Sequence, residues 1–318
     1  MKKAIIFFLF SYSFVFSQEN VKFSKTINIL DLEKHLAILA SDSLEGRETG
    51  KKGQKMAAAY IKNHFKEIGI PPYKGKKYYQ KFKVKSGRHL CKCDDCDMPF
   101  IKKLLGQKKK IKGENVLGYI EGTDLKEELI IITAHYDHLG KHDSLIFNGA
   151  DDDGSGTVAA MEIAEAFMLA KKEAKGPRRS ILIMAVSGEE KGLLGSKYYT
   201  NHPIYPLENT VANLNIDMIG RIGDFHSDPN YVYLIGSDML STELHNISEA
   251  VNKKYIGLDL DYTFNTEDDP NKYYYRSDHY NFAKNNIPVI FYFNGIHEDY
   301  HKATDTIEKI NFEKIEKI

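Results

Sequence analysis

Histidines and carboxylates recur in this chain directly after apolar segments. Imidazole nitrogens and carboxylate oxygens are the ligands that zinc ions take from proteins, and a glutamate beside such ions can act as a base. These residue types therefore predict a hydrolase with two zinc ions. They occur in the runs HYDH (135–138), GADDDGSG (149–156), SGEEKGLLGS (187–196), NIDMIG (215–220) and EDYHKATDT (298–306).

Each of these runs, taken alone, also has a common structural explanation. An HxD spacing is typical of a surface turn, and the pair Glu189-Glu190 could compensate a helix dipole. The acidic run resembles a calcium-binding loop, but it fails that template. With Gly154 in the glycine position, the first ligand position falls on Gly149 rather than on an acid. A shared metal site accounts for all the runs at once, whereas the separate explanations require independent coincidences.

The apolar segments predict how these residues are positioned. Helical spacing predicts helices between residues 28 and 70, interrupted by SDSLEGRETGKKG, and residues 78–84 form a predicted strand. Further predicted strands lie at 116–120, 129–133, 181–186, 211–216 and 287–293, and a helix at 154–171. This alternation predicts an α/β fold with three layers, α/β/α, a mostly parallel central sheet and a helical N-terminal segment.

The predicted sheet brings the reactive residues to one edge. In open α/β sheets, ligands bind beyond the carboxyl ends of the strands. His135, Glu189-Glu190, Asp217 and the loop to His301 all lie there. Asp137 lies two residues after His135, so its carboxylate is expected to accept the second ring N–H of that histidine. Three other histidines compete with His301 as a ligand, namely His138, His142 and His297.

Length and charge limit the possible classes of protein. The chain has 318 residues, which suits one large α/β domain or two small ones. The 44 Lys and Arg residues equal the 44 Asp and Glu residues. No global field therefore favours nucleic acid or an acidic membrane, and we expect neither as a partner.

The first residues have the features of a signal peptide. Lys2-Lys3 precede an apolar run from Ala4 to Phe16, and Val15 and Ser17 suit the positions that a signal peptidase reads. The run is shorter than the roughly 20 apolar residues of a membrane span, and an uncleaved anchor is the alternative. We expect residues 1–17 to be removed and the protein to be periplasmic or extracellular, without stable membrane insertion.

Residues 18–113 form the predicted N-terminal region, and residues 114–318 the catalytic core. The N-terminal region contains a polar, Lys-rich insert at about 85–113. The insert carries Cys91, Cys93 and Cys96 in LCKCDDCDMP. One pair could form a local disulfide, or the thiolates could hold a metal, and both interpretations stay open.

The ordered motifs of the chain resemble those of a known family. HYDHLG, NGADDDGSG, AVSGEEKGLLGS, NLNIDMIGR, YRSDH and HKATDT resemble, in order, the motifs of secreted zinc-dependent aminopeptidases of the bacterial leucyl-aminopeptidase type. This family of zinc exopeptidases also holds glutamate carboxypeptidases and glutaminyl cyclases. The resemblance runs from about residue 28 to the end, apart from the insert. It implies a phosphorylase/hydrolase-like fold and hydrolysis of the N-terminal bond of peptides that have a free N-terminus.

The resemblance also implies which residues hold the two Zn²⁺ ions. Asp152, the middle acid of its triplet, would bridge both. One zinc would add His135 and Asp217, and the other Glu190 and His301. Manganese or cobalt could occupy the same set of nitrogen and oxygen ligands.

The resemblance assigns the catalytic roles in the same way. Glu189 would be the general base that activates a metal-bridging water. Asp137 is expected to support the same site through its contact to His135, as its spacing predicts. Tyr274 or Tyr275 is expected to donate to the oxyanion. A cis peptide is expected between Asp152 and Asp153.

Two other classes of function are alternatives to an aminopeptidase. One is a carboxypeptidase-like or glutaminyl-cyclase-like enzyme on the same metal site. The other is a non-catalytic, receptor-like ectodomain. Cyclases of this kind use one zinc, and receptor-like relatives lose ligands, whereas this chain keeps all five predicted ligands and Glu189. An aminopeptidase, with a monomer favoured, is therefore the leading hypothesis.

Overall fold

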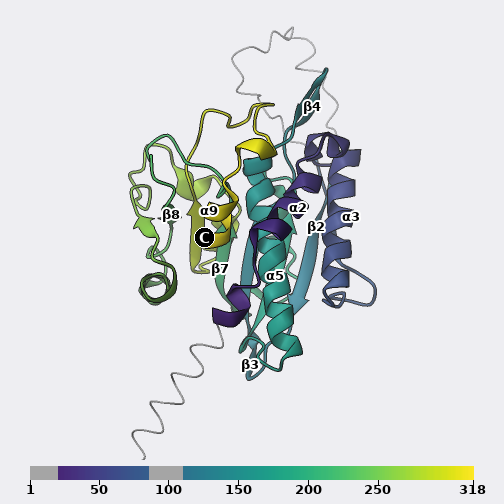
Figure 1. The fold of residues 1–318 in the computed structure, drawn as a ribbon. Coiled ribbons are helices and arrows are strands. Elements are labelled where there is room, and N and C mark those ends of the chain that lie inside the picture. Colours follow the sequence, from purple (N-terminus) through teal and green to yellow (C-terminus); the bar gives the residue numbers. More distant parts are fainter. Residues whose placement is uncertain (1–20, 86–109) are drawn as a thin grey trace, which may run out of the picture.

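A computed structural model describes residues 21–85 and 110–318 of the chain. Its centre is an eight-stranded sheet with the order β1-β2-β6-β3-β7-β10-β8-β9 (Figure 1). The expectations for residues 1–17 and for the three cysteines lie outside the described residues. The strands are β1 (Tyr79–Lys85), β2 (Lys110–Ile120), β3 (Leu125–His135), β6 (Arg179–Val186), β7 (Thr210–Ile216), β8 (Tyr231–Ile235), β9 (Asp259–Asp261) and β10 (Val289–Phe293).

Helices cover both faces of this sheet, and a short hairpin lies outside it. Figure 1 shows α2, α3 and α5 together on the near face. Helices α6 and α8 contact each other and pack against the opposite face. The helices are α2 (Ile29–Leu39), α3 (Lys52–Glu67), α5 (Gly156–Lys172), α6 (Leu194–Asn201), α7 (Thr242–Val251), α8 (His279–Ala283) and α9 (Phe312–Lys317), and the hairpin is β4 (Gly140–His142) with β5 (Leu145–Phe147).

The predicted three-layer fold is confirmed, and its parallel part is the centre of the sheet. Strands β6, β3, β7 and β10 are parallel neighbours. The antiparallel pairing at the edges of the sheet was not predicted. Strand β1 pairs antiparallel with β2, β2 runs antiparallel to β6, and β8 runs antiparallel to β10. The segment YVYLI of β8 was overlooked because five apolar residues alone do not distinguish a strand from a helix.

The core explains why the central strands read as continuous apolar runs. In β6, Ile181 and Ile183 pack in the cluster under α2, α3 and α5, whereas Leu182 and Met184 face the cluster of α6 and α8. Successive side chains of a strand point to opposite faces. Because both faces are covered, every position of β6 from Ile181 to Val186 is apolar.

The N-terminal helices belong to the same core as the sheet. Leu32 and Leu36 of α2 and Ile61 and Phe65 of α3 are buried in the cluster that also contains Ile183. Helix α2 begins at a capping residue, since the Asn28 side chain accepts a hydrogen bond from the amide of Asp31. In the described part of the chain, no helix is long and apolar enough to cross a membrane.

His64 of α3 makes the stability of this core depend on pH. Burial, reinforced by the nearby charge of His35, lowers the pKa of His64 to about 4. The unfolded chain would bind this proton near pH 6.5, so the folded state prefers the neutral ring. Its contribution is therefore complete above about pH 6.5 and is lost as the pH falls towards 4, by roughly 3 kcal/mol in total.

A His64→Gln variant tests this dependence in chelator-treated protein. We expect urea unfolding to show a smaller loss of stability between pH 7 and pH 4.5 for the variant than for the parent chain. His142→Gln, at an exposed position of the hairpin, is the matched control and should leave the loss unchanged. An equal loss in the His64 variant would contradict the assignment.

Candidate metal centre

The carboxyl ends of the four parallel strands position the predicted site. His135 is the last residue of β3, and Asp217 directly follows β7. Glu189 and Glu190 lie in the turn between β6 and α6, and His301 lies in the loop after β10. Residues far apart in sequence therefore meet because their strands are neighbours in the sheet.

The structure brings all five predicted ligands together around Asp152. Its Oδ1 lies 3.2 Å from His135 Nε2, and that nitrogen lies 3.5 Å from Asp217 Oδ1. Its Oδ2 lies 3.1 Å from His301 Nε2, which is 3.4 Å from Glu190 Oε2. The two oxygens of one carboxylate thus face two different groups of donors.

The spacing of these donors fits a pair of metal ions. Zinc binds nitrogen and oxygen at about 2.0–2.2 Å in tetrahedral geometry, which places two donors on one ion about 3.3–3.6 Å apart. The observed separations of 3.1–3.5 Å are close to this value. Among the described residues, the buried Asp152 Oδ2 has no hydrogen-bond partner, as expected for an atom that faces a cation.

The middle acid is ionised at the centre of this cluster. Burial alone would raise the pKa of Asp152, but facing imidazoles outweigh it and hold the pKa well below its ordinary value. These are the rings of His138, His135 and His301. A carboxylate that keeps its charge when buried is a suitable bridging ligand for cations.

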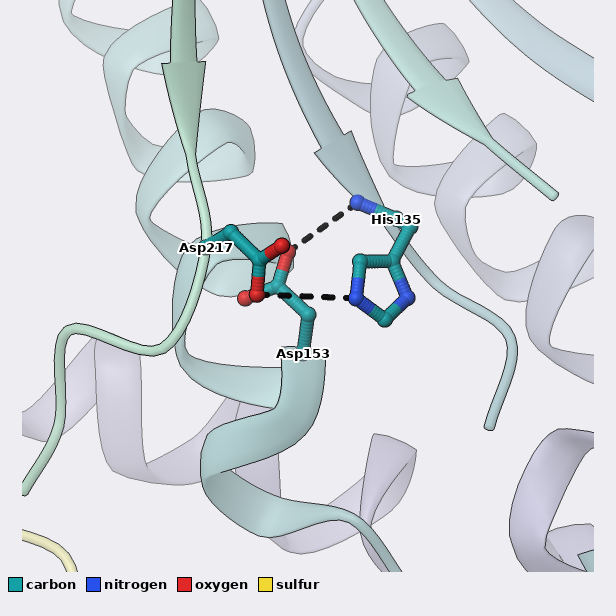
Figure 2. A group of neighbouring side chains, drawn as sticks. All are labelled: His135, Asp153 and Asp217. Atoms are coloured by element: carbon teal, nitrogen blue, oxygen red, sulfur yellow. Dashed lines mark hydrogen bonds and ion pairs between the residues drawn. The ribbon is translucent and has the colours of Figure 1, made fainter. Parts of the chain in front are cut away.

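The carboxylates of the two outer acids of the triplet, Asp151 and Asp153, accept hydrogen bonds from backbone amides instead. Asp153 accepts hydrogen bonds from the amides of His135, Gly156 and Met218 at 2.9–3.1 Å. Asp151 Oδ1 accepts from the amide of Gly220 at 2.6 Å. Figure 2 shows the Asp153 contact to the main-chain nitrogen of His135, while Asp217 faces the ring. The expected cis peptide between Asp152 and Asp153 is confirmed.

Asp137 supports the site in a different way from the one expected. The ring Nδ1 of His135 lies 3.0 Å from the backbone carbonyl of Asp137 and 3.9 Å from its carboxylate. The carboxylate accepts instead from the amide of Glu189 at 3.3 Å and from the hydroxyl of Thr49. The tautomer of His135 is therefore set by a carbonyl, because the Asp137 carboxylate is turned towards the Glu189 turn.

Glu189 borders the cavity next to the ligands. The described residues that line the cavity include His135, Asp152, Glu189 and Asp217. Burial raises the pKa of Glu189 well above its ordinary value, and the charges of Glu190 and Asp217 raise it further, although His135 lowers it. Glu189 is therefore a carboxylate poised to accept a proton beside the predicted ligands.

The tyrosines of the cavity differ from those expected. Of the described residues, Tyr273 and Tyr300 line it. Tyr274 and Tyr275 line a separate hollow with Met239 and Leu240. The prediction that Tyr274 or Tyr275 donates to the oxyanion is thus not supported by their placement, because the short helix Tyr273–Tyr275 turns successive side chains in different directions.

Two site residues were missed in the sequence. Asp305 accepts hydrogen bonds from the amides of Asp151 and Asp152 at 3.0–3.1 Å and so holds the acidic turn. Ser277 donates to Asp217 Oδ2 at 2.6 Å. They lie in the motifs HKATDT and YRSDH, but neither residue type indicates its partner.

Arg47 is a buried clamp that the sequence did not reveal. Its guanidinium donates to four carbonyls at 2.5–2.8 Å, those of Leu39, Tyr136, Asn148 and Gly149. It thereby ties the segment after β3 to the segment before the acidic turn. A buried carbonyl left without a partner costs about 1–3 kcal/mol.

Replacing Arg47 with Met is therefore expected to lower the free energy of unfolding by about 3–5 kcal/mol. Urea unfolding of chelator-treated protein measures this change without a contribution from metal binding. Arg178, an exposed arginine paired with Asp124, is the control, and Arg178→Met should leave the free energy of unfolding nearly unchanged. Similar losses in the two variants would contradict the role of Arg47.

The fold and the site together define a mostly parallel α/β protein with a histidine–carboxylate metal centre at its strand ends. The model of Peptidase family M28 matches residues 115–318. The match spans well over half of the chain, and the chain belongs to Peptidase family M28.

Individual relatives match shorter regions. Aminopeptidase YwaD of Bacillus subtilis is 29% identical over 166 residues, which cover 46% of this chain and 34% of the relative. A probable glutamate carboxypeptidase of Arthroderma benhamiae is 32% identical over 145 residues, covering 45% of this chain and 17% of the relative. The matches thus span only a part of these relatives' length.

Solved structures share the fold across almost the whole chain. The LapA aminopeptidase of Legionella pneumophila superimposes with a TM-score of 0.68 at 23% identity, covering 95% of this chain and 71% of that one. BSAP, a zinc aminopeptidase from Bacillus subtilis, gives a TM-score of 0.67 at 18% identity, covering 91% and 92%. At these identities the similarity establishes the fold.

Proposed function

We propose that this chain is a di-zinc aminopeptidase, which hydrolyses the N-terminal bond of peptides with a free N-terminus. The observation that carries the proposal is the placement of Asp152, whose two oxygens lie 3.2 and 3.1 Å from His135 and His301. Membership of Peptidase family M28 and the zinc aminopeptidases of the same fold support it.

In this proposal, each ion has three protein ligands. His135, Asp152 and Asp217 hold one zinc, and Asp152, Glu190 and His301 hold the other. When bound, the two ions polarise the scissile carbonyl and lower the pKa of water, so that hydrolysis proceeds at neutral pH. The protein residues keep the donors in place, because Ser277 donates to the Asp217 carboxylate and Asp305 accepts from the backbone amide of Asp152 in the acidic turn.

Glu189 performs the proton transfers of the proposed reaction. Its carboxylate takes a proton from the attacking water as the oxygen bonds to the scissile carbon. It then gives the proton to the amine nitrogen as the carbon–nitrogen bond breaks. The Asp137 carboxylate accepts the amide N–H of Glu189 and so positions this turn beside the ligands.

The charge of the site favours a substrate amine close to the scissile bond. The acidic side chains of Asp152, Glu189 and Asp217 line the cavity. An excess of negative charge in a partly buried site attracts the ammonium of a peptide N-terminus. An aminopeptidase uses this attraction to select the end of the chain.

One residue favours a second candidate, a carboxypeptidase-like activity. Arg276 lines the cavity with its guanidinium 3.5 Å from the Tyr300 hydroxyl and over the ring of Tyr273. In the described ranges it has no carboxylate partner. An exposed arginine at the cavity suits recognition of a substrate carboxylate.

Metal analysis beside a substrate panel tests both candidates. We expect about two zinc ions per chain and cleavage of aminoacyl-nitroanilides, with N-acetylated peptides resistant. Cleavage of N-blocked peptides from their C-terminus would favour the second candidate. Absence of bound metal after reconstitution would contradict both.

We also propose that the protein is exported after removal of residues 1–17. The basic start and the apolar run from Ala4 to Phe16 support this location. N-terminal sequencing of the protein from culture fractions should find a mature chain that starts soon after Ser17.

A further inference from the structure

His138 is a buried histidine beside the second metal position, and the proposed ligand set does not use it. Its Nδ1 lies 2.8 Å from Glu190 Oε1 and 3.8 Å from Asp152 Oδ2. Its ring meets the ring of His301 edge to face at a centroid distance of 5.9 Å. With Asp152 and Glu190 it forms a group whose possible ligand atoms lie within 4.8 Å of one another.

The surrounding structure holds this ring in place. His138 is 1% exposed, and its amide donates to the carbonyl of Arg47 at 3.4 Å. Gly149 packs against the ring so closely that a Cβ there would lie 2.5 Å from Cγ of His138. The carbonyl of Gly149 also accepts a hydrogen bond from the Arg47 guanidinium. The imidazole is therefore clamped between the two segments that Arg47 joins.

The polar atoms of the ring are not used elsewhere. Neither ring nitrogen has an aligned hydrogen-bond partner among the described residues, and the same holds for Glu190 Oε1. Buried polar groups of this kind are rare without a function or a bound group. The ring and the carboxylate oxygen face each other across 2.8 Å, and a small rotation of either group would align them.

The distances distinguish His138 from the proposed ligands. The five ligands are separated by 3.1–3.5 Å, as donors on a shared ion would be, whereas the His138–Glu190 separation is in the range of a hydrogen bond. The two oxygens of Glu190 also face different rings, since Oε2 faces His301 and Oε1 faces His138. Ligating carboxylates are commonly held by such an outer hydrogen bond.

We propose that His138 is a positioning residue of the second metal position. Its Nδ1–H donates to Glu190 Oε1 in the metal-loaded protein, which keeps Oε2 directed towards the ion shared with His301 and Asp152. This inference rests on the proposed two-zinc site. It assigns to the second ion a dependence on His138 that the first ion, at His135 and Asp217, does not share.

Zinc titration of His138→Ala and His138→Asn tests the proposal. We expect His138→Ala to bind the first zinc normally and the second about 10- to 100-fold more weakly, measured by competition with a chelator and by elemental analysis. The Asn side chain carries an N–H near the place of Nδ1, so His138→Asn should recover most of this loss. His142→Ala, at an exposed histidine of the hairpin, is the matched control and should bind both ions like the parent chain.

Cobalt substitution separates positioning from ligation. We expect the cobalt absorption bands of fully loaded His138→Asn to match those of the parent chain. Bands that indicate a lost nitrogen ligand would overturn the positioning role, and so would equal affinity for the second ion in His138→Ala. A parent chain that binds no metal would overturn the proposed function itself, and this inference with it.

Discussion

Replacing Glu189 with Gln is expected to abolish most peptide hydrolysis while both zinc ions stay bound. Glutamine keeps the size of the side chain but cannot accept a proton, and general-base catalysis contributes about 10²–10⁴-fold to a rate. Glu189 is not among the donors that face Asp152, so metal content should remain about two per chain. Steady-state kinetics on an aminoacyl-nitroanilide, with elemental analysis of the same preparation, measures both quantities.

Two controls make this result specific. Glu208→Gln changes an exposed glutamate of the short helix Leu207–Asn209 and should leave the rate unchanged. Separate values of kcat and KM distinguish a lost base from a misplaced substrate, because loss of the base reduces kcat more than it raises KM. Full activity in Glu189→Gln would rule out this residue as the base.

Replacing Asp152 with Ala is expected to remove both zinc ions, which is a larger effect than the loss of any other single ligand. Its Oδ1 faces His135 of one proposed ion site and its Oδ2 faces His301 of the other. Zinc per chain should fall from about two to near zero after dialysis, and activity should fall to background.

Thermal unfolding gives a second readout for Asp152. Ligand binding to the folded state raises stability by about 4 kcal/mol when the free ligand is 1,000 times its Kd. Added zinc should therefore raise the Tm of the parent chain but not that of Asp152→Ala. Asp143→Ala, at an exposed position of the hairpin, is the control. An Asp152→Ala variant that keeps two tightly bound ions would contradict the bridging role.

Much of the site could be predicted because its residues follow strands. Buried strands are continuous apolar runs, so the positions of His135 and Asp217 at strand ends were visible in the sequence. The acidic run GADDDGSG, which contains Asp152, was also visible in the sequence. The family resemblance then orders the residues into two proposed ion sites, whose neighbouring donors lie 3.1–3.5 Å apart in the structure.

The supporting residues could not be predicted, because their roles depend on long-range packing. Arg47 looks like an ordinary polar residue in the loop LEGRETG, yet it is buried against four carbonyls from three segments. Asp305 looks like a loop acid, yet it holds the amides of the acidic turn. His138 had the same residue type as His301, and only its distances show that the two rings contact Glu190 differently.

The sequence by itself determined the central strands of the sheet, the chemistry of the donors and the edge of the sheet on which they lie, since these depend on local apolar patterns and residue types. The tertiary structure alone decided which oxygen faces which ring, which acids are held by the backbone, and which tyrosines border the cavity. Those relations are set by contacts between residues up to about 150 positions apart, such as Asp152 and His301. The local sequence around a residue does not reveal such a contact. Each residue is compatible with its own strand, helix or turn whether or not its partner is nearby.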